Sequence, residues 1–360
     1  MPKTILVPLD GSALAERAAA YATALAEHLD AHIVLIRAVL TVHPRSRDER
    51  FNAEASAAAE QELSTVGMSC RQKVPTEWLV WQDEAGWAIV EAAKSKNADL
   101  IVMSTHGRSG LGRWLYGSVA DRVLRTADGP IILVPPGARD DWEAAKPFRV
   151  VIALDGSALG EQALGPALEL ARAMGGEVHL VVAMDPPYYW VSGDAYSAYD
   201  PSVEFAAARK YLDGVAERAR ATGLTVSAEV TWGPPDRVVL DAARAIQAHL
   251  IALATHGRGG LARLAMGSVT QGVLHRTRVP LLIVRPAEVR ESVKAGARPE
   301  RPRVSPEAPL ALLLTAREAT VARAALAHFA EDASQAEQDL RTARDLLNRV
   351  TDVLDSAQSD

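Results

Sequence analysis

Short apolar stretches alternate with longer amphipathic stretches over the first 287 residues of the chain. Each apolar stretch ends at polar or glycine residues, which is typical of a strand buried on both faces of a sheet. Helix 13–29 shows the amphipathic pattern well, because Leu14, Tyr21 and Leu25 share one face. The alternation predicts an α/β fold with parallel, doubly wound sheets. In the first half we expect strands at 5–9, 33–39, 78–81, 100–103 and 131–134, and helices at 13–29, 54–65, 85–96 and 119–126.

A domain-sized repeat organises this pattern. The segment ILVPLDGSAL at 5–14 returns as VVIALDGSAL at 150–159, an offset of 145 residues (155 − 10). The segment THGR at 105–108 returns at 255–258, an offset of 150. An offset of this length is too long for a solenoid unit and indicates duplication of a whole five-stranded fold. The second half should therefore contain strands near 150–154, 178–183, 226–231, 250–254 and 281–284.

The repeat predicts two domains, at 1–146 and 147–287, followed by a different composition. Residues 288–309 are rich in Pro, Arg, Glu and Ala and are typical of a linker. Residues 310–360 carry a heptad-like apolar stripe and predict a helical hairpin or one broken helix. This C-terminal helical extension could dock on the sheet domains or join protomers, and the sequence leaves both open.

Composition and charge narrow the classes of partner. Of the 360 residues, 48% are hydrophobic and 23% charged, which is enough for packed cores. The net charge of −6 argues against sequence-independent nucleic-acid binding, which needs many cationic contacts. The single cysteine, Cys70, excludes an internal disulfide and favours a cytoplasmic protein. We expect no signal peptide and no membrane span, because no apolar run approaches about 18 residues.

A glycine-rich loop follows the strand at 100–103 and leads to Gly117, Ser118 and a helix. Glycines let backbone N–H groups face an anion, and a helix N-terminus favours phosphate. Ser118 is expected to cap this helix. The same arrangement returns before Gly267 and Ser268. The loop lacks the lysine of a P-loop, and it does not follow the first strand as a dinucleotide fingerprint would. It therefore predicts a phosphate site in each repeat.

Asp10 and Asp155 end the first strand of each repeat, at the edge of the sheet where the glycine-rich loop also lies. A carboxylate there can accept hydrogen bonds from a ribose hydroxyl or an adenine amino group. It can instead help to cap the following helix, and Ser12 and Ser157 allow both roles to coexist.

Together these residues resemble the ATP-binding members of the universal stress protein family. Their motif is glycine, two residues, glycine, nine residues, glycine, and then Ser or Thr. Ser104 and Ala254 stand where the motif has its first glycine, and both are small enough for a backbone to approach a ligand. The resemblance covers about residues 1–287 and implies two tandem Rossmann-like sheets of the adenine nucleotide α-hydrolase type. The last two glycines match with nine residues between them in both repeats, at Gly107 and Gly117 and at Gly257 and Gly267.

The resemblance implies roles for individual residues. Asp10 and Asp155 would contact the adenosine, and the backbone near Ala38 and Ala183 would contact the adenine edge. The ligand would be ATP, or AMP or ADP in its place, with Mg or Mn. The phosphates would be held by Gly107, Arg108, Gly110, Gly117 and Ser118 in the first repeat and by Gly257, Arg258, Gly267 and Ser268 in the second.

The implied function is a cytoplasmic stress-response protein, a sensor or regulator whose conformation or partners depend on nucleotide. The sequence contains no readable nucleophile–base pair or metal cluster, so no catalytic or metal-binding residue is assigned. Two alternatives stay open. One is a slow ATPase using the same pockets, and the other is a scaffold that works through its C-terminal helices without nucleotide.

The resemblance also implies pairing of the last strands, 131–134 and 281–284, within the chain, which would hide two apolar edges. This would make the two domains an intramolecular pseudo-dimer, and a homodimer of chains is also compatible with it. The two nucleotide sites are expected to differ in affinity, with the first the better one, since His249 replaces Asp99 ahead of the fourth strand.

Overall fold

The computed structural model describes residues 2–39, 48–105, 117–139, 142, 146–184, 201–255 and 267–287. The expected linker at 288–309 and the expected helices of 310–360 lie outside these ranges. Within the described residues, no helix is both long and apolar enough to cross a bilayer.

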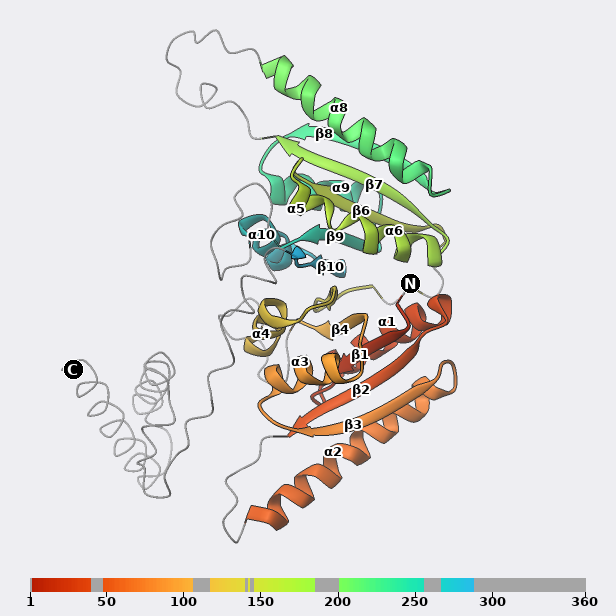
Figure 1. Cartoon of the computed structure of the whole chain (residues 1–360), viewed down its shortest axis with the longest axis vertical. Helices are drawn as coiled ribbons and strands as arrows, with labels where there is room; N and C mark the ends of the chain where they lie inside the picture. The colour runs from red at the N-terminus through yellow and green to blue at the C-terminus, as the bar shows by residue number, and fades with distance from the viewer. Residues whose placement is uncertain are drawn as a thin grey trace, which may run out of the picture. The chain divides into compact units, whose positions relative to one another are not determined.

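The first repeat contains five strands and four helices among its described residues (Figure 1). All five expected strands are present within a few residues of their expected bounds. Of the four helices, α1 has its expected bounds, α2 and α4 are longer than expected, and α3 ends one residue early. In chain order the elements are β1 (Thr4–Pro8), α1 (Ala13–Leu29), β2 (His32–Val39), α2 (Asp48–Arg71), β3 (Thr76–Gln82), α3 (Ala85–Ser95), β4 (Leu100–Ser104), α4 (Ser118–Thr126) and β5 (Ile131–Val134).

The second repeat follows the same order, with its first long helix broken into two. The break falls at Gln162 and Ala163, just ahead of Gly165 and Pro166, and Pro166 is tolerated because it lies in the first turn of the new helix. The elements are β6 (Phe148–Leu154), α5 (Ala158–Glu161), α6 (Leu164–Ala173), β7 (Gly176–Met184), α8 (Pro201–Arg220), β8 (Thr225–Trp232), α9 (Pro235–Ala245), β9 (Leu250–Ala254), α10 (Ser268–Arg276) and β10 (Leu281–Val284).

Each repeat forms the expected five-stranded parallel sheet, and the two sheets join edge to edge. The strand order is β3-β2-β1-β4-β5-β10-β9-β6-β7-β8. The strands of each half are parallel, whereas β5 and β10 pair antiparallel, with Ile132 opposite Leu282. The last strands of the two repeats therefore pair within the chain, and neither is left as an open edge.

Hydrophobic layers cover both faces of this sheet. Ile5 and Val7 of β1 pack in the layer that contains α1, whereas Leu6 between them packs in the layer that contains α3 and α4. Because successive side chains of a strand point to opposite faces, a strand covered on both sides must be apolar at every position. The continuous apolar stretches of the sequence have this physical cause.

Candidate functional site

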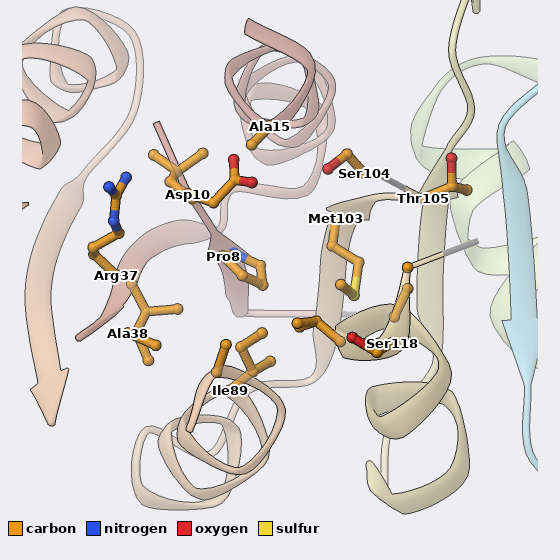
Figure 2. Close-up of a pocket in the computed structure, with 16 residues that line it drawn as sticks. Pro8, Asp10, Ala15, Arg37, Ala38, Ile89, Met103, Ser104, Thr105 and Ser118 are labelled. Atoms are coloured by element: carbon orange, nitrogen blue, oxygen red, sulfur yellow. The ribbon is translucent and has the colours of Figure 1, made fainter. Parts of the chain in front are cut away.

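A cavity of about 320 Å³ lies at the carboxyl ends of β1, β2 and β4, beside the first turn of α4 (Figure 2). Open α/β sheets bind ligands at this edge, where the loops that follow the strands meet. The sheet order places β1 between β2 and β4, which brings together residues that are far apart in the sequence. Five residues expected in the site line the cavity: Asp10, Ala38, Ser104, Gly117 and Ser118.

The Asp10 carboxylate organises the turn after β1. Its Oδ1 accepts hydrogen bonds from the backbone N–H of Ser12 at 3.0 Å and from the Ser12 hydroxyl at 2.6 Å. Ser12 is the N-cap of α1, and its Oγ accepts a hydrogen bond from the backbone N–H of Ala15 at 3.2 Å. Asp10 therefore orients the capping residue rather than capping the helix itself. The same carboxylate lines the cavity, and Figure 2 shows it directed toward the side on which Ser104 lies.

One hydrogen bond joins the two ends of the glycine-rich loop. The backbone N–H of Gly117 donates to the carbonyl oxygen of Thr105 at 2.8 Å, and the Thr105 N–H donates to β5. The loop thus leaves and returns at the cavity. Residues 106–116 lie outside the described part of the chain, so the phosphate contacts expected of Gly107, Arg108 and Gly110 stay predictions.

Helix α4 begins at the cavity without a side-chain cap. Gly117 already has the extended N-cap conformation, with φ −64° and ψ 152°, so Ser118 is the first helical residue. The expected cap by the Ser118 hydroxyl is therefore wrong, and Asp121 forms an ion pair with Arg125 at 2.8 Å. Ser118 and Val119 line the cavity, where the first-turn N–H groups and the helix dipole favour a negative charge.

The other walls are apolar, apart from one cation that the sequence analysis did not single out. Ile36, Ile89 and Met103 are buried and line the cavity. Arg37 also lines it, and its Nη1 lies 2.9 Å from Glu62 Oε2, with only 12% of the arginine side chain exposed. An arginine near the end of an otherwise apolar stretch was the available signal for this position.

The second repeat builds the same turn and the same loop closure. The Oδ1 of Asp155 accepts hydrogen bonds from the N–H of Ser157 at 3.0 Å and from its hydroxyl at 2.7 Å. The N–H of Gly267 donates to the carbonyl oxygen of Thr255 at 2.8 Å. Gly267 is the N-cap of α10, and Ser268 follows as its first residue, again without a side-chain cap.

The remaining expected residues of the second site lie at the ends of their strands. Ala183 is the second-last residue of β7, and Ala254 is the last residue of β9. Gly257 and Arg258 lie outside the described residues, and their expected phosphate contacts stay predictions.

The two sites differ in the space around their aspartates. Gly160 takes the place that Ala15 has in the first repeat (160 − 15 = 145). A Cβ atom on Gly160 would lie 2.4 Å from the Asp155 Oδ1, which is closer than any real contact. Because Gly160 has no side chain, the Asp155 carboxylate lies close to its helix. In the first repeat the methyl group of Ala15 keeps the Asp10 carboxylate farther from the helix.

A hydroxyl also distinguishes the two sites. The Thr270 hydroxyl donates to the carbonyl oxygen of Ala254 at 3.1 Å. The corresponding residue of the first repeat is Ala120 (270 − 120 = 150), which has no side-chain donor. The backbone of Ala254, where the motif has its first glycine, is thus already engaged by the protein.

The exchange of Asp99 for His249 does not reach either site. The Asp99 Oδ2 accepts hydrogen bonds from the N–H groups of Lys3 and Thr4 at 2.8 and 3.0 Å. The His249 Nδ1 accepts one from the N–H of Arg149 at 3.0 Å. Both side chains satisfy backbone donors where the first strand of their repeat begins, at the end of the sheet opposite the cavity. This exchange is therefore the wrong reason to expect different affinities.

The first cavity combines a carboxylate, a cation, a helix N-terminus and apolar walls. These groups suit a ligand that has a ring, hydroxyl groups and phosphates. In the described part of the chain, no three or more His, Cys, Asp or Glu side chains are grouped to hold a metal ion. Cys70 does not line this cavity; it is buried, and burial raises the pKa of its thiol.

Known proteins resemble the chain over most of its length. It is 29% identical to a universal stress protein of Mycolicibacterium smegmatis over 302 residues, covering 78% of this chain and 97% of that protein. It is also 29% identical to a universal stress protein of Mycobacterium tuberculosis over 245 residues, covering 59% of this chain and 80% of that protein.

Solved structures show the same fold. A crystal structure of a universal stress protein from Archaeoglobus fulgidus aligns with a TM-score of 0.61 at 21% identity, covering 78% of this chain and 98% of that one. The model of the universal stress protein family matches residues 1–135 and again residues 148–285. These two matches take in both repeats, with the cavity of the first inside them. The chain therefore belongs to the universal stress protein family and carries two tandem copies of its domain.

Proposed function

We propose that the cavity of the first repeat binds an adenine nucleotide, ATP or in its place ADP or AMP. The observation that carries this proposal is the meeting of five separately expected residues in one cavity at the carboxyl edge of the sheet. Its volume of about 320 Å³ falls within the range of roughly 300–1,000 Å³ that is typical of small-molecule sites.

Each group of the cavity has a part in this proposal. The apolar side chains of Ile36, Ile89 and Met103 offer a surface for the adenine ring, and the backbone near Ala38 lies beside them. Asp10 would accept hydrogen bonds from the ribose hydroxyls. The phosphates would extend toward Gly117, Ser118 and the first turn of α4, where N–H groups and the helix dipole stabilise negative charge.

A divalent ion, Mg or Mn, would accompany ATP. Phosphate oxygens supply most of the ligands of such an ion in nucleotide sites, and few protein ligands are needed. Asp10, the one carboxylate among the described residues that line the cavity, fits an ion held mainly by the nucleotide.

The function proposed for this site is that of a nucleotide-dependent sensor or regulator in the stress response. Asp10 is the one carboxylate that lines the cavity among the described residues, and its Oδ1 is already bonded twice to Ser12. This arrangement lacks the oriented nucleophile and base that efficient catalysis requires. The paired strands β5 and β10 further support an intramolecular pseudo-dimer, through which one repeat can respond to ligand in the other.

Calorimetric titration of the full chain with MgATP tests the proposal. Asp10→Asn keeps the Oδ1 acceptor for Ser12 but removes the charge, so the turn can still fold. It should weaken binding about tenfold, the equivalent of about 1.4 kcal/mol. Asp155→Asn is the matched control in the second repeat. It should leave the affinity of the first repeat for MgATP unchanged.

The outcomes separate the proposal from its alternatives. No saturable binding up to millimolar MgATP would contradict nucleotide binding and favour a scaffold. Steady phosphate release from ATP that is lost in Asp10→Ala would favour the slow ATPase.

A further inference from the structure

The seam between β5 and β10 has a local two-fold symmetry. Ile132 pairs with Leu282, and these are corresponding residues of the two repeats (282 − 132 = 150). Because corresponding residues face each other there, every feature near the seam should have a counterpart on its other side. Differences between the two sides are therefore informative.

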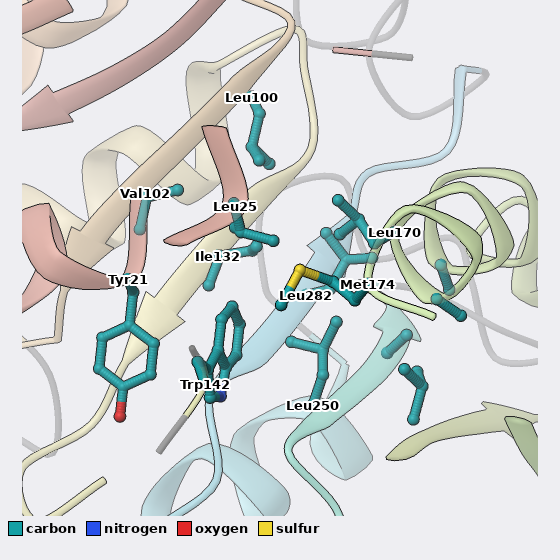
Figure 3. Close-up of a cluster of buried hydrophobic side chains, with 14 of the residues drawn as sticks. Tyr21, Leu25, Leu100, Val102, Ile132, Trp142, Leu170, Met174, Leu250 and Leu282 are labelled. Carbon is teal, nitrogen blue, oxygen red and sulfur yellow. The ribbon is translucent and has the colours of Figure 1, made fainter. Parts of the chain in front are cut away.

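On one side of the seam, Trp142 fills a site between the two repeats (Figure 3). Its ring makes edge contacts with Tyr21 of α1 and with Phe148 of β6, at centroid distances of 4.7 and 5.0 Å. Its indole N–H donates to the carbonyl oxygen of His249 at 3.1 Å. With 3% of its surface exposed, Trp142 anchors the chain that leaves β5.

The counterpart of the Trp142 site is a cavity of about 220 Å³. Leu100, Leu170 and Leu282 line it together with three prolines, and Asp99 and Glu169 add carboxylates. The correspondence is residue by residue: Leu100, Asp99 and Pro166 of this cavity match Leu250, His249 and Tyr21 around Trp142 (offsets of 150, 150 and 145). One half of a symmetric pair is thus filled by the chain itself, and the other is a cavity.

The chain that leaves β10 starts on the same course as the chain that leaves β5. After β5, the Arg17 guanidinium donates to the carbonyl oxygen of Ala138. After β10, the backbone N–H of Ala287 donates to Gln162 Oε1 at 2.8 Å. Gln162 corresponds to Arg17 (162 − 17 = 145), so corresponding residues hold the departing chain in both repeats.

We propose that residues 288–295 dock in this cavity, as the chain around Trp142 does on the other side. The residue corresponding to Trp142 is Ser292 (292 − 142 = 150), and Val293 next to it supplies an apolar side chain for the leucines. Arg290 and Lys294 lie within the same segment and complement the carboxylates of Asp99 and Glu169. The seam thereby holds the first residues after β10, at the end of the sheet opposite the cavity of the first repeat.

Limited trypsin digestion of the full chain, followed by mass spectrometry, tests this docking. Cleavage after Arg290 and Lys294 should be slow relative to cleavage after Arg303, which lies beyond the docking segment. Glu169→Trp places an indole at the cavity and should speed cleavage at Arg290 and Lys294 about tenfold by displacing the segment. Glu217→Trp, an exposed site on α8, is the matched control and should change nothing.

Disulfide trapping provides a second readout in the full chain. In a Cys70→Ala background, Glu169→Cys together with Val293→Cys should form an intramolecular disulfide under mild oxidation, since docking brings the two residues within bonding reach. The pair Glu217→Cys and Val293→Cys should not. Equal proteolysis of both tryptophan variants, or failure of the first cysteine pair to cross-link, would overturn the proposal. A cross-link between two chains would overturn it too, and would assign the cavity to a second copy.

Discussion

Alanine at Gly117 and at Gly267 is expected to produce two separate effects, one on nucleotide binding and one on stability. A Cβ atom on Gly117 would lie 3.6 Å from the Thr105 carbonyl oxygen, an ordinary van der Waals contact. On Gly267 it would lie 2.8 Å from the Thr255 oxygen, so the loop closure there must shift. Overpacking of this kind costs about 1–3 kcal/mol.

The comparison cancels the other contributions of the substitution. Both glycines are N-caps with negative φ, −64° and −56°, so the loss of a favoured cap residue and the stiffening of the unfolded chain are the same at both. The difference between the two variants therefore isolates the steric clash. Gly267→Ala should melt several degrees below Gly117→Ala, at about 2–4 °C per kcal/mol for a domain of this size.

Thermal unfolding with and without MgATP measures both effects. A ligand that binds the folded state raises the melting temperature, and the rise follows its affinity. Gly117→Ala should melt above Gly267→Ala without ligand and lose most of the rise with MgATP, because its methyl group occupies space beside the proposed phosphate site. A full MgATP shift in Gly117→Ala would refute the close approach of phosphate to this backbone. Equal stabilities of the two variants would refute the steric argument.

Two further predictions concern the buried Trp142 and Cys70. Trp142→Ala should lower the free energy of unfolding by about 3–5 kcal/mol in urea titrations, since it removes a buried ring at the seam. Trp142→Phe should cost about 1 kcal/mol, mainly for the hydrogen bond to His249, and an equal loss in both variants would contradict this division. Burial raises the pKa of the Cys70 thiol above its ordinary value, so the unfolded thiol ionises first as pH rises. The stability that Cys70 contributes relative to Cys70→Ala should be complete at pH 7 and decline above about pH 9, and a difference that does not change with pH would refute this.

Patterns of apolar residues predict the strands well because a strand covered on both faces is apolar at nearly every position. Helix bounds are harder to predict, and α2 shows why. The expected helix was 54–65, but α2 runs from Asp48 to Arg71, past Thr65 and Gly67. Gly67 normally weakens a helix, yet here a Cβ would lie 2.4 Å from the Trp78 ring. The glycine makes room for a tertiary contact with β3, which local propensity does not record.

The candidate site divides in the same way between what the sequence contains and what only the fold supplies. Asp10 and Gly117 could be found because their types and spacing suit phosphate and ribose, and the repeat shows them twice. Arg37 left only the signal of an arginine near the end of an apolar stretch, and Met103 left none, because their place in the cavity depends on the order of the strands in the sheet. Ser118 is expected to cap α4 but is its first helical residue. Gly117, one residue earlier, already has the extended N-cap conformation.

The two repeats have kept the same strand seam while their sites have diverged. At the seam, corresponding residues face each other, so a change in one strand alters its own packing partner. At the sites, each repeat contacts only its own ligand space, so one site can differ from the other without disturbing it. Arg37 corresponds to Val182, and Ala15 to Gly160, so the second site lacks the cation and holds its aspartate closer to the helix. The expected difference in affinity thus rests on these positions at the carboxyl edge, and it favours the first repeat as the nucleotide site.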